Sequence, residues 1–376
     1  MQPIYLDFNT TTPLAPSVQE SMQPYWAEHF LLPDQEHHGS RAIAEGLERA
    51  REGVAEMIGC DAFEIVFTDG GTEANNLAVL GLATDCPPGH MLISELEHDS
   101  VWNAARSLQR AGWDIEAVPC GSDGVVVAEE FTVRLRTNTR LACLQAANPV
   151  LGTLQPVREV AEACHAEGVL VHCDASQMFG KLPVDISRLR ADTLSISGHK
   201  FYGPKGTGAL YVRRGLVVRP IRFGESREMG VRPGTENVPG LVGLGTAAQL
   251  AARCAVEAAD RLSELTDRFV FRLRDTIDPA VEVACETSPR LPNTVTLILP
   301  TAAHHLQRVA SPLIVATAQS AAPADEMTRC LAAIGMAPPQ IRGALRVSIG
   351  WTTSQEQIDR AADLIAEAWD QAMHHR

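Results

Sequence analysis

The stretch SISGHKFYGPKGTGALYV, residues 195–212, sets two lysines and four glycines between two apolar runs. Glycine lets the backbone turn sharply and lets a bound group approach it closely. A lysine in such a turn is a solvated charge, a phosphate-binding group, or a covalent catalyst that forms a Schiff base with an aldehyde. The segments around this stretch distinguish between these roles.

Short apolar runs alternate with helical patterns from about residue 43 to residue 213. The strand candidates are 64–68, 91–94, 141–147, 169–175, 193–197 and 209–212, and the helical patterns are 43–58, 72–83, 98–111, 127–137 and 156–167. This alternation predicts an α/β fold with a mostly parallel sheet covered on both faces, and ligands bind beyond the carboxyl ends of such strands. Thr72 is expected to cap the helix of 72–83.

The pattern changes after about residue 245. A long helical pattern covers 246–275, and it is followed by strand candidates at 293–299, 312–318 and 344–349 and by helices near 324–334 and from 355. We therefore expect a smaller α+β domain after the large one. The predicted boundaries are residues 15–250 for the large domain, and residues 1–14 with 251–376 for the small domain.

Composition limits the classes of protein to be considered. With 376 residues, 45% hydrophobic and 21% charged, the chain is typical of a soluble globular protein. Its net charge of −14 opposes non-specific binding to nucleic acid. The N-terminus lacks the pattern of a signal peptide, and no apolar run reaches the ~18 residues of a membrane span. We therefore expect a cytoplasmic protein with no nucleic-acid or membrane partner.

Nine cysteines are present, without a CxxC pair, and several lie in apolar stretches. This usage is typical of reduced core thiols. Cys164, His165, His172 and Cys173 lie close together in sequence, but their spacing matches no common zinc pattern. We therefore expect no metal site.

Residues suited to chemistry follow the predicted strands. Gly71 and Thr72 lie at a strand-to-helix turn, where free amides and a hydroxyl suit a phosphate, although an ordinary helix start explains them equally well. His98 follows the run of 91–94, where a lone histidine is more often structural. Taken singly, these residues do not establish a site.

The two strand candidates that follow carry stronger signals. Asp174 ends the run of 169–175 with Gln177 beyond it, and a carboxylate there is costly to bury unless a cation pairs with it. Ser197, His199 and Lys200 follow the run of 193–197. A phosphate-binding helix start, an aromatic histidine, a strand-end aspartate and a lysine in a glycine turn are the parts that pyridoxal phosphate (PLP) needs.

Rival nucleotide and hydrolase motifs are missing from the sequence. No GxxxxGK[ST] occurs, so a nucleotide P-loop is not expected. No GxGxxG opens a helix after the first strands, which weakens a nicotinamide site, and no GxSxG marks a serine hydrolase.

The chain resembles the class V aminotransferase-fold PLP enzymes, and most closely the cysteine desulfurase and selenocysteine lyase (NifS-like) branch. The motifs that carry the resemblance are collinear from end to end: YLDFNTTTPL (5–14), GGTEANN (70–76), LEHDS (96–100), GTLQPV (152–157), HCDASQ (172–177), SGHKFYGPKG (197–206), RPGTENVPG (232–240), LPNT (291–294) and LRVSIG (345–350). The resemblance implies the type I PLP-dependent transferase fold, similar to aspartate aminotransferase, with PLP as cofactor.

The resemblance also implies roles for the residues around the PLP ring. Lys200 would hold the cofactor covalently and then transfer protons. Asp174 would pair with the pyridine nitrogen, so that the ring withdraws electrons. His98 would stack on the ring as a second catalytic residue, and Gln177 would bond the ring hydroxyl.

Further residues would bind the phosphate and the substrate. The phosphate site implied by the resemblance comprises Gly71, Thr72, Ser197 and His199, and Thr235 would complete the phosphate site of a partner subunit in a homodimer. Arg346 would bind the carboxylate of an amino-acid substrate as a bidentate fork, with Asn148 helping and also touching the cofactor. His37, in LPDQEHHGS (32–40), is the remaining substrate-binding candidate.

The nucleophilic cysteine of the desulfurase branch has no counterpart in this sequence. Ala321 occupies its expected position in LIVATAQSAAPADEMTRCLAAIGM (313–336), or Ala322 if the loop is shifted. Cys330 lies in an apolar helical pattern, which indicates a buried thiol. NPV (148–150) and Trp351 also depart from the family, and such clustered departures favour divergence over one engineered substitution.

The missing thiol restricts the expected reaction. A desulfurase transfers sulfur to a thiolate and releases alanine, whereas removal of the Cα proton and loss of a β-substituent yields aminoacrylate, which decays to pyruvate and ammonia. We expect a PLP-dependent C–S lyase of this eliminating kind, acting on a cysteine-like amino acid. The alternatives are a cysteine desulfurase whose nucleophile was mutated, a class V aminotransferase, and a non-catalytic binding partner in a sulfur pathway.

Overall fold

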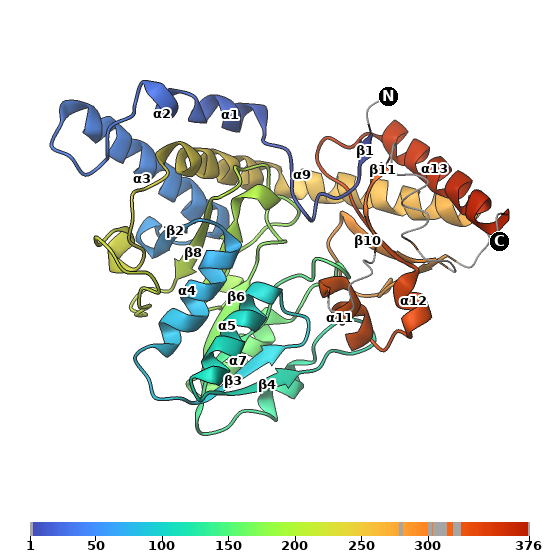
Figure 1. Cartoon of the computed structure of the whole chain (residues 1–376), viewed down its shortest axis with the longest axis horizontal. Coiled ribbons are helices and arrows are strands. Elements are labelled where there is room, and N and C mark those ends of the chain that lie inside the picture. Colours follow the sequence, from blue (N-terminus) through green and yellow to red (C-terminus); the bar gives the residue numbers. More distant parts are fainter. Residues whose placement is uncertain (1–2, 278–280, 300–302, 304–313, 319–324, 375–376) are drawn as a thin grey trace.

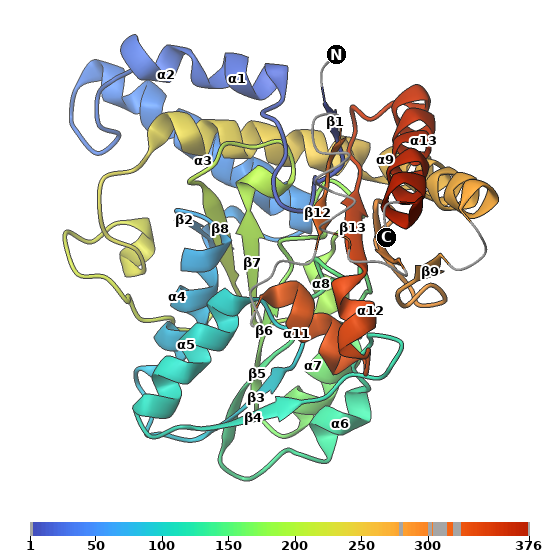
Figure 2. The ribbon, with the colours of Figure 1, turned by 45° about the vertical axis from the view of Figure 1, so that its right-hand side comes forward.

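The structure is a computed structural model of the chain, and it describes residues 3–277, 281–299, 303, 314–318 and 325–374. A seven-stranded sheet flanked by helices forms the larger part, and a smaller group of strands and helices lies beside it (Figure 1; Figure 2). The long helix α9, Val238–Thr276, runs along both parts.

The large sheet has the strand order β2-β8-β7-β6-β5-β3-β4. The pairs from β7 to β4 are parallel, and β8 runs antiparallel to both of its neighbours. The predicted mostly parallel sheet is therefore confirmed. The strands are β2 Ile65–Thr68, β3 His90–Ser94, β4 Asp114–Val118, β5 Thr139–Cys143, β6 Leu170–Asp174, β7 Thr193–Ser197 and β8 Gly208–Val212.

The edge strand β4 and the short helix α6 differ from the predictions. The sequence does not predict β4, DIEAV, because at the sheet edge only Val118 is fully buried and no apolar run results. The helix predicted over 127–137 is reduced to α6, Ala128–Thr132.

Both faces of the sheet are apolar, because successive residues of a strand point to opposite sides. Leu92 of β3 joins the core shared with α3 and α9, whereas Met91 and Ile93 join the core under α4 and α5. Burial on both sides explains why the strands read as continuous apolar runs. The helices of this part are α1 Pro16–Met22, α2 Pro24–Ala27, α3 His38–Ile58, α4 Gly71–Ala83, α5 Asp99–Arg110, α6, α7 Val157–Ala166 and α8 Ile186–Leu189, with short 3-10 turns at Ala62–Glu64, Gly198–Lys200 and Glu228–Gly230.

Helix α9 begins earlier than the predicted residue 246. The Asn237 side chain caps it by accepting a hydrogen bond from the Gly240 amide at 3.3 Å. Gly245 lets α9 approach α3 closely, since a Cβ there would lie 2.3 Å from the Cα of Ala50. The helix continues through residue 250, so the domain boundary expected there stays a prediction.

The smaller part contains two further sheets, a four-stranded one ordered β12-β13-β10-β9 with antiparallel neighbours and a parallel pair of β1 and β11. Helix α13 packs on the second half of α9, where Arg268 pairs with Asp359 at 2.6 Å. The elements are β1 Ile4–Tyr5, β9 Glu282–Val283, β10 Thr294–Ile298, β11 Ile314–Val315, β12 Thr317–Ala318, β13 Ala344–Ser348, α11 Glu326–Ala333, α12 Pro338–Arg342 and α13 Gln355–His374.

The segment that follows β1 joins the two parts. The Asn9 amide donates to Ser348 Oγ of β13 at 2.9 Å, and the Thr12 amide donates to the carbonyl of His199 at 2.9 Å. Residues 9–12 are thereby held between β13 and the turn that follows β7.

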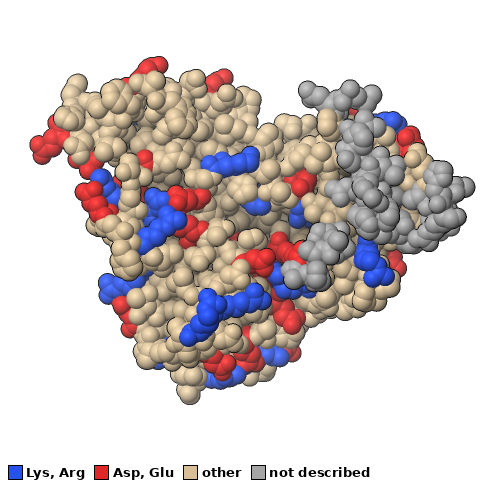
Figure 3. All heavy atoms as spheres, viewed as in Figure 1, with Lys and Arg blue, Asp and Glu red and all other residues tan. Residues whose placement is uncertain are grey.

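The surface carries mixed charge. In Figure 3, Lys and Arg side chains are interspersed with Asp and Glu on the face shown. No helix in the described part of the chain is long and apolar enough to cross a membrane. Within the same residues, no group of three or more His, Cys, Asp and Glu side chains is arranged to hold a metal ion.

Candidate active site

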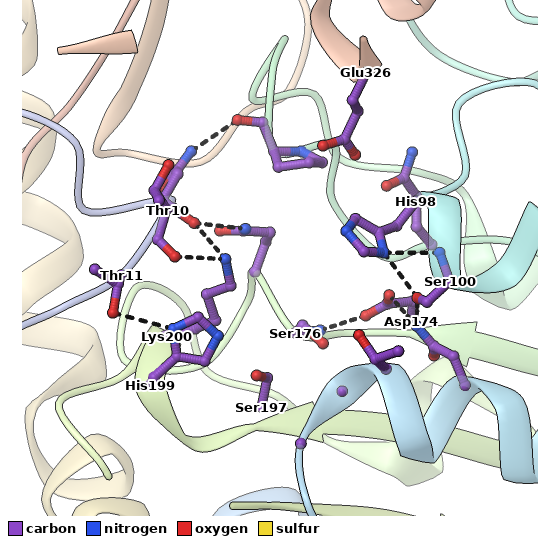
Figure 4. A pocket seen from close by; sticks show the side chains of 18 of the residues that line it. Thr10, Thr11, His98, Ser100, Asp174, Ser176, Ser197, His199, Lys200 and Glu326 are labelled. Atoms are coloured by element: carbon purple, nitrogen blue, oxygen red, sulfur yellow. Dashed lines mark hydrogen bonds between the residues drawn. The ribbon is translucent and has the colours of Figure 1, made fainter. Parts of the chain in front are cut away.

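A cavity of about 650 Å³ lies at the carboxyl ends of β6 and β7, beside the first turn of α4. Side chains from both parts of the molecule and from the segment after β1 point into it (Figure 4). The cavity brings together most of the predicted site residues: Gly71, Thr72, His98, Asp174, Gln177, Ser197, His199, Lys200 and Arg346.

One end of the cavity is formed by the start of α4. Gly70 caps this helix with a φ of 140°, so the prediction that Thr72 is the cap is wrong, and Thr72 lies in the first turn instead. A Cβ on Gly71 would come within 3.0 Å of Ser176 Oγ and 3.2 Å of Ser197 Cβ. The glycine pair therefore leaves backbone amides and two nearby hydroxyls open to the cavity, an arrangement that suits a phosphate.

Asp174 is buried and has no cation beside it among the described residues. Its Oδ2 accepts from Asn75 Nδ2 at 2.7 Å, and its Oδ1 accepts from the Ser176 amide at 3.0 Å. A buried carboxylate with only neutral donors has room for a cationic partner, and a protonated pyridine nitrogen would supply one.

A chain of buried hydrogen bonds extends behind Asp174. Burial lowers the pKa of His172 to about 4, so its ring is neutral and carries one N–H. His172 Nε2 lies 2.9 Å from Asn75 Oδ1 and donates to it, while Nδ1 lies 2.9 Å from Thr193 Oγ1 and accepts. The Asn75 amide is thereby fixed with its NH2 group toward Asp174.

Asn75 also reaches His98. Its Nδ2 donates to Ser100 Oγ at 2.8 Å, and that hydroxyl lies 2.7 Å from His98 Nδ1. The Ser100 amide donates to the same nitrogen at 3.1 Å, so Nδ1 is an acceptor and the ring proton resides on Nε2. Asn75 thus connects the two side chains that were predicted to contact the PLP ring.

Lys200 lies across the cavity from Asp174 (Figure 4). Its Nζ donates to the carbonyls of Asn9 at 2.7 Å and Thr10 at 2.9 Å. Burial, with the nearby charge of Arg346 as a further cause, lowers the pKa of Lys200 to about 8. With that pKa about a tenth of the amine is neutral, and able to accept a proton, at pH 7.

Arg346 of β13 forms the opposite end of the cavity. Its Nη2 donates to Asp7 Oδ1 at 2.6 Å and to Thr10 Oγ1 at 2.7 Å. Its Nη1 makes one long hydrogen bond, 3.3 Å, to the carbonyl of Pro149. The guanidinium is thus held from one side and retains donors for a carboxylate.

Glu326, at the start of α11, also lines this end (Figure 4). Among the residues that the structure describes, its Oε1 is buried and has no hydrogen-bond partner. The substrate end of the cavity therefore presents one cationic and one anionic side chain, both from the smaller part of the molecule.

The structure does not bring Asn148, His37 or Thr235 to the cavity. The Asn148 side chain is fully buried, and its Oδ1 accepts from the amides of Val150 and Leu151 at 2.9 and 2.8 Å. His37 and Thr235 are exposed and do not line the cavity. Ala321 and Ala322 lie outside the described residues.

Several lining residues were not among the predicted site residues: Asn9, Thr10, Asn75, Ser100, Ser176 and Glu326. Most of them lie inside motifs that carry the family resemblance, namely YLDFNTTTPL, GGTEANN, LEHDS and HCDASQ. Their position inside these motifs could therefore have identified the other five residues as site candidates. Glu326 lies in none of the motifs, so the sequence offered no such indication for it.

The chain is similar to known proteins over nearly its whole length. The family described as aminotransferase class-V matches residues 4–361. Over 369 residues the chain is 35% identical to "Cysteine desulfurase IscS" of Dictyoglomus turgidum, covering 96% of this chain and 93% of the relative. Over 376 residues it is 35% identical to "Cysteine desulfurase" of Nostoc sp., covering 98% and 93%.

Two solved structures are also similar to this chain over most of its length. A "NIFS-LIKE PROTEIN" superposes with a TM-score of 0.91 at 31% identity, covering 98% of this chain and 100% of that chain. "SspA in complex with cysteine" superposes with a TM-score of 0.81 at 31% identity, covering 92% and 98%.

Proposed function

Because this chain belongs to the class-V aminotransferase family, in its cysteine desulfurase branch, we propose that it cleaves the C–S bond of a cysteine-like amino acid by β-elimination. The predicted family, the type I PLP-dependent fold and the PLP dependence are confirmed. The reaction and the role of each residue are proposed from the geometry of the cavity.

The cavity has the donors and acceptors that PLP requires. Asp174 would face the pyridine nitrogen, His98 would lie on the ring, and the start of α4 with Ser197 and His199 would hold the phosphate. Burial lowers the pKa of His199 to about 4, so its ring is neutral and carries a single N–H. When bound, PLP supplies an electron-withdrawing ring that stabilises negative charge at the substrate Cα.

Lys200 is proposed to hold PLP and then to carry the Cα proton on Nζ. Its lowered pKa, about 8, makes the free amine available as a base. Arg346 would bind the substrate carboxylate through Nη1, because Nη2 is already held by Asp7 and Thr10. With PLP held by Lys200 and the substrate carboxylate held by Arg346, the Cα–H bond would point toward Lys200.

The observation that carries the proposal is that no thiol lines the cavity. All nine cysteines of the chain are among the described residues, and none of them is a lining residue. Cys330 is fully buried in α11, and burial raises the pKa of its thiol to about 12. Without a thiolate to accept sulfur, the Cα–H electron pair would form the Cα–Cβ double bond while the sulfur leaves as a thiolate.

A second candidate reaction is supported by the names of the relatives, which are cysteine desulfurases. In this alternative the chain retains the desulfurase site but lacks its loop thiol. Introducing one by Ala321→Cys should then restore the formation of alanine from cysteine, with the sulfur held as a persulfide on the new thiol until an added dithiol reductant releases it as sulfide. An Ala321→Cys variant that still forms pyruvate alone would exclude this alternative.

We also propose that the protein is a homodimer in which Thr235 completes the phosphate site of the partner. The support is that Thr235 is exposed, outside the cavity of its own chain, so it is free to reach a second copy. Sedimentation should give a dimer, and Thr235→Ala should weaken PLP binding. A monomer with unchanged PLP affinity in the variant would contradict this proposal.

Product analysis tests the proposed reaction. Purified protein loaded with PLP is given L-cysteine and L-cystine in separate reactions, and pyruvate, ammonia, alanine and sulfide are measured. Pyruvate and ammonia in equal amounts, dependent on Lys200, would support elimination. Alanine in place of pyruvate would overturn it, and the Lys200→Ala variant controls for reaction with free PLP.

A further inference from the structure

Lys181 is a buried lysine that the proposed reaction does not use. Its side chain is almost fully buried, and within the described residues its amine contacts amide oxygens and no carboxylate. Burial, with the nearby charges of Lys200 and Arg346, lowers the pKa of Lys181 well below its ordinary value. A lysine in such a setting is costly to bury, which indicates that its contacts serve a role.

The Lys181 amine has two hydrogen bonds, both to side-chain amide oxygens. Nζ donates to Gln177 Oε1 at 2.6 Å and to Asn9 Oδ1 at 2.9 Å. Gln177 lines the cavity and was predicted to contact the PLP ring hydroxyl. Lys181 therefore lies directly behind a residue of the proposed cofactor site.

The bond from Lys181 determines which end of the Gln177 amide faces the cavity. Gln177 Nε2 donates to the carbonyl of Asn9 at 3.1 Å, and the same carbonyl accepts from Lys200 Nζ at 2.7 Å. The NH2 group thus lies on the Lys200 side, with the oxygen on the Lys181 side. A flipped amide would lose the bond from Lys181 Nζ and would turn its oxygen toward the Asn9 carbonyl, which has no proton to donate.

Lys181 also holds the segment that receives Lys200. Asn9 Oδ1 accepts from Lys181 and, at 3.2 Å, from Asn293 Nδ2, while Asn9 Nδ2 donates to Thr294 Oγ1 at 2.9 Å. The Asn9 side chain is therefore fixed on both of its polar atoms. The contacts with Asn293 and Thr294 do not involve Lys181, so the Asn9 carbonyl that accepts from Lys200 should keep its place when Lys181 is replaced.

We infer that Lys181 is a positioning residue that orients the Gln177 amide, so that Gln177 donates a hydrogen bond to the ring oxygen of PLP and cannot accept one. This inference rests on the proposed function, since it needs Gln177 to contact the ring. A donor at that position favours the ionised ring oxygen, which only accepts hydrogen bonds. Lys181 touches neither substrate nor cofactor and acts through Gln177.

A double-mutant cycle tests the inference on the PLP-loaded protein. The variants are Lys181→Met, Gln177→Ala and the pair together, and the absorption band of bound PLP and its dissociation constant are measured. We expect Lys181→Met to move the band in the same direction as Gln177→Ala. It should weaken PLP binding by about tenfold, the effect of one ordinary hydrogen bond.

The PLP affinity of the double variant distinguishes a positioning role of Lys181 from an effect that is independent of Gln177. If Lys181 acts through Gln177, the double variant should bind PLP within about twofold of Gln177→Ala alone. Arg188→Met, which removes a cation whose side chain is 84% exposed on α8, is the matched control and should leave the band unchanged. Additive losses in the double variant would overturn the inference.

The remaining outcomes separate the inference from the proposed function. An unchanged band in Lys181→Met with a lower melting temperature would mean that Lys181 only stabilises the fold. An unchanged band in Gln177→Ala would instead remove Gln177 from the cofactor site and so contradict the proposed site. If Lys181→Met does not fold, Lys181→Arg takes its place, because it keeps a donor beside Gln177. An absorption band of Lys181→Arg like that of Gln177→Ala would overturn the inference.

Discussion

The two ends of the cavity are built in different ways. The cofactor end comes from α4, β6 and β7, and its side chains are joined by a continuous hydrogen-bond chain from Thr193 to Asp174. The substrate end joins Asp7 to Arg346, residues 339 positions apart in sequence. The cofactor end is therefore built within the large sheet and its helices, whereas the substrate end depends on how the two parts of the molecule pack together.

This difference indicates where change is tolerated. A substitution at the cofactor end disturbs several hydrogen bonds of one buried network, so the PLP site is expected to vary little. The substrate end depends on contacts between separate segments, and one of them is made by Pro149, from the NPV stretch (148–150) that departs from the family pattern. Four experiments test this contrast, beginning with the one that should have the largest effect.

Substituting Arg346→Met should damage substrate binding and leave the cofactor end intact. Loss of a charge-assisted carboxylate contact typically costs about 2–3 kcal/mol, so we expect KM to rise about 30- to 100-fold. PLP affinity should change less than about threefold, because the contacts of Asp174 do not involve Arg346. A larger loss would show that the two ends are not independent, and Arg342→Met, on the exposed side of α12, is the control.

Substituting Asn75→Ala should damage the cofactor end and leave substrate binding nearly unchanged. It removes one hydrogen-bond partner from each of Asp174, Ser100 and His172, and an unmade buried hydrogen bond costs about 1–3 kcal/mol. We expect PLP affinity and the free energy of unfolding to fall while KM changes less than about threefold. Asn103→Ala, an exposed asparagine on α5, should have neither effect, and equal losses in both variants would refute the role of Asn75.

The protonation of Lys200 should make the stability of the PLP-free protein depend on pH. Its pKa is about 8 in the folded protein and about 10.4 in an unfolded chain, so between these values only the unfolded chain binds the proton. The free energy of unfolding should therefore rise with pH across this window, by at most about 3 kcal/mol.

Denaturant unfolding at pH 7.5, 8.5 and 9.5 measures this effect. Lys200→Met should lack the increase, and the difference between the two proteins isolates Lys200 from other groups that titrate in the same range. Parallel pH profiles for the two proteins would mean that the lysine is not desolvated as the structure indicates.

The smallest effect is expected for Cys330→Ser. The Cys330 thiol is buried, 3.4 Å from Asn148 Nδ2, and it does not line the cavity. We expect product formation within about twofold of the original protein and a modest loss of stability, since a hydroxyl is less suited to an apolar core than a thiol. A large loss of activity without unfolding would identify Cys330 as a relocated nucleophile.

The sequence predicted the fold and the cofactor end better than the substrate end, for a physical reason. Asp174, Ser197 and Lys200 follow strands of one parallel sheet, and the carboxyl ends of such strands meet at one edge. The contacts of Asn9 and Thr10 with Lys200 depend on hydrogen bonds between residues about 190 positions apart, which local patterns do not encode.

The case of Asn148 shows a further limit of motif-based assignment. Its place in a motif suggested binding, but its amide is used to hold the turn of residues 148–151. The role of a polar side chain depends on whether its hydrogen-bonding groups are already satisfied, and that is known only from the folded structure.

Helix α9 has a mechanical consequence. Its 39 residues correspond to a rod about 58 Å long, which packs on α3 at one end and on α13 at the other. After Gly245 it contains neither glycine nor proline, the residues at which helices usually bend. A hinge between the two parts would have to break this rod, so we expect substrates to enter through local movement at the rim of the cavity, with both parts moving as one body.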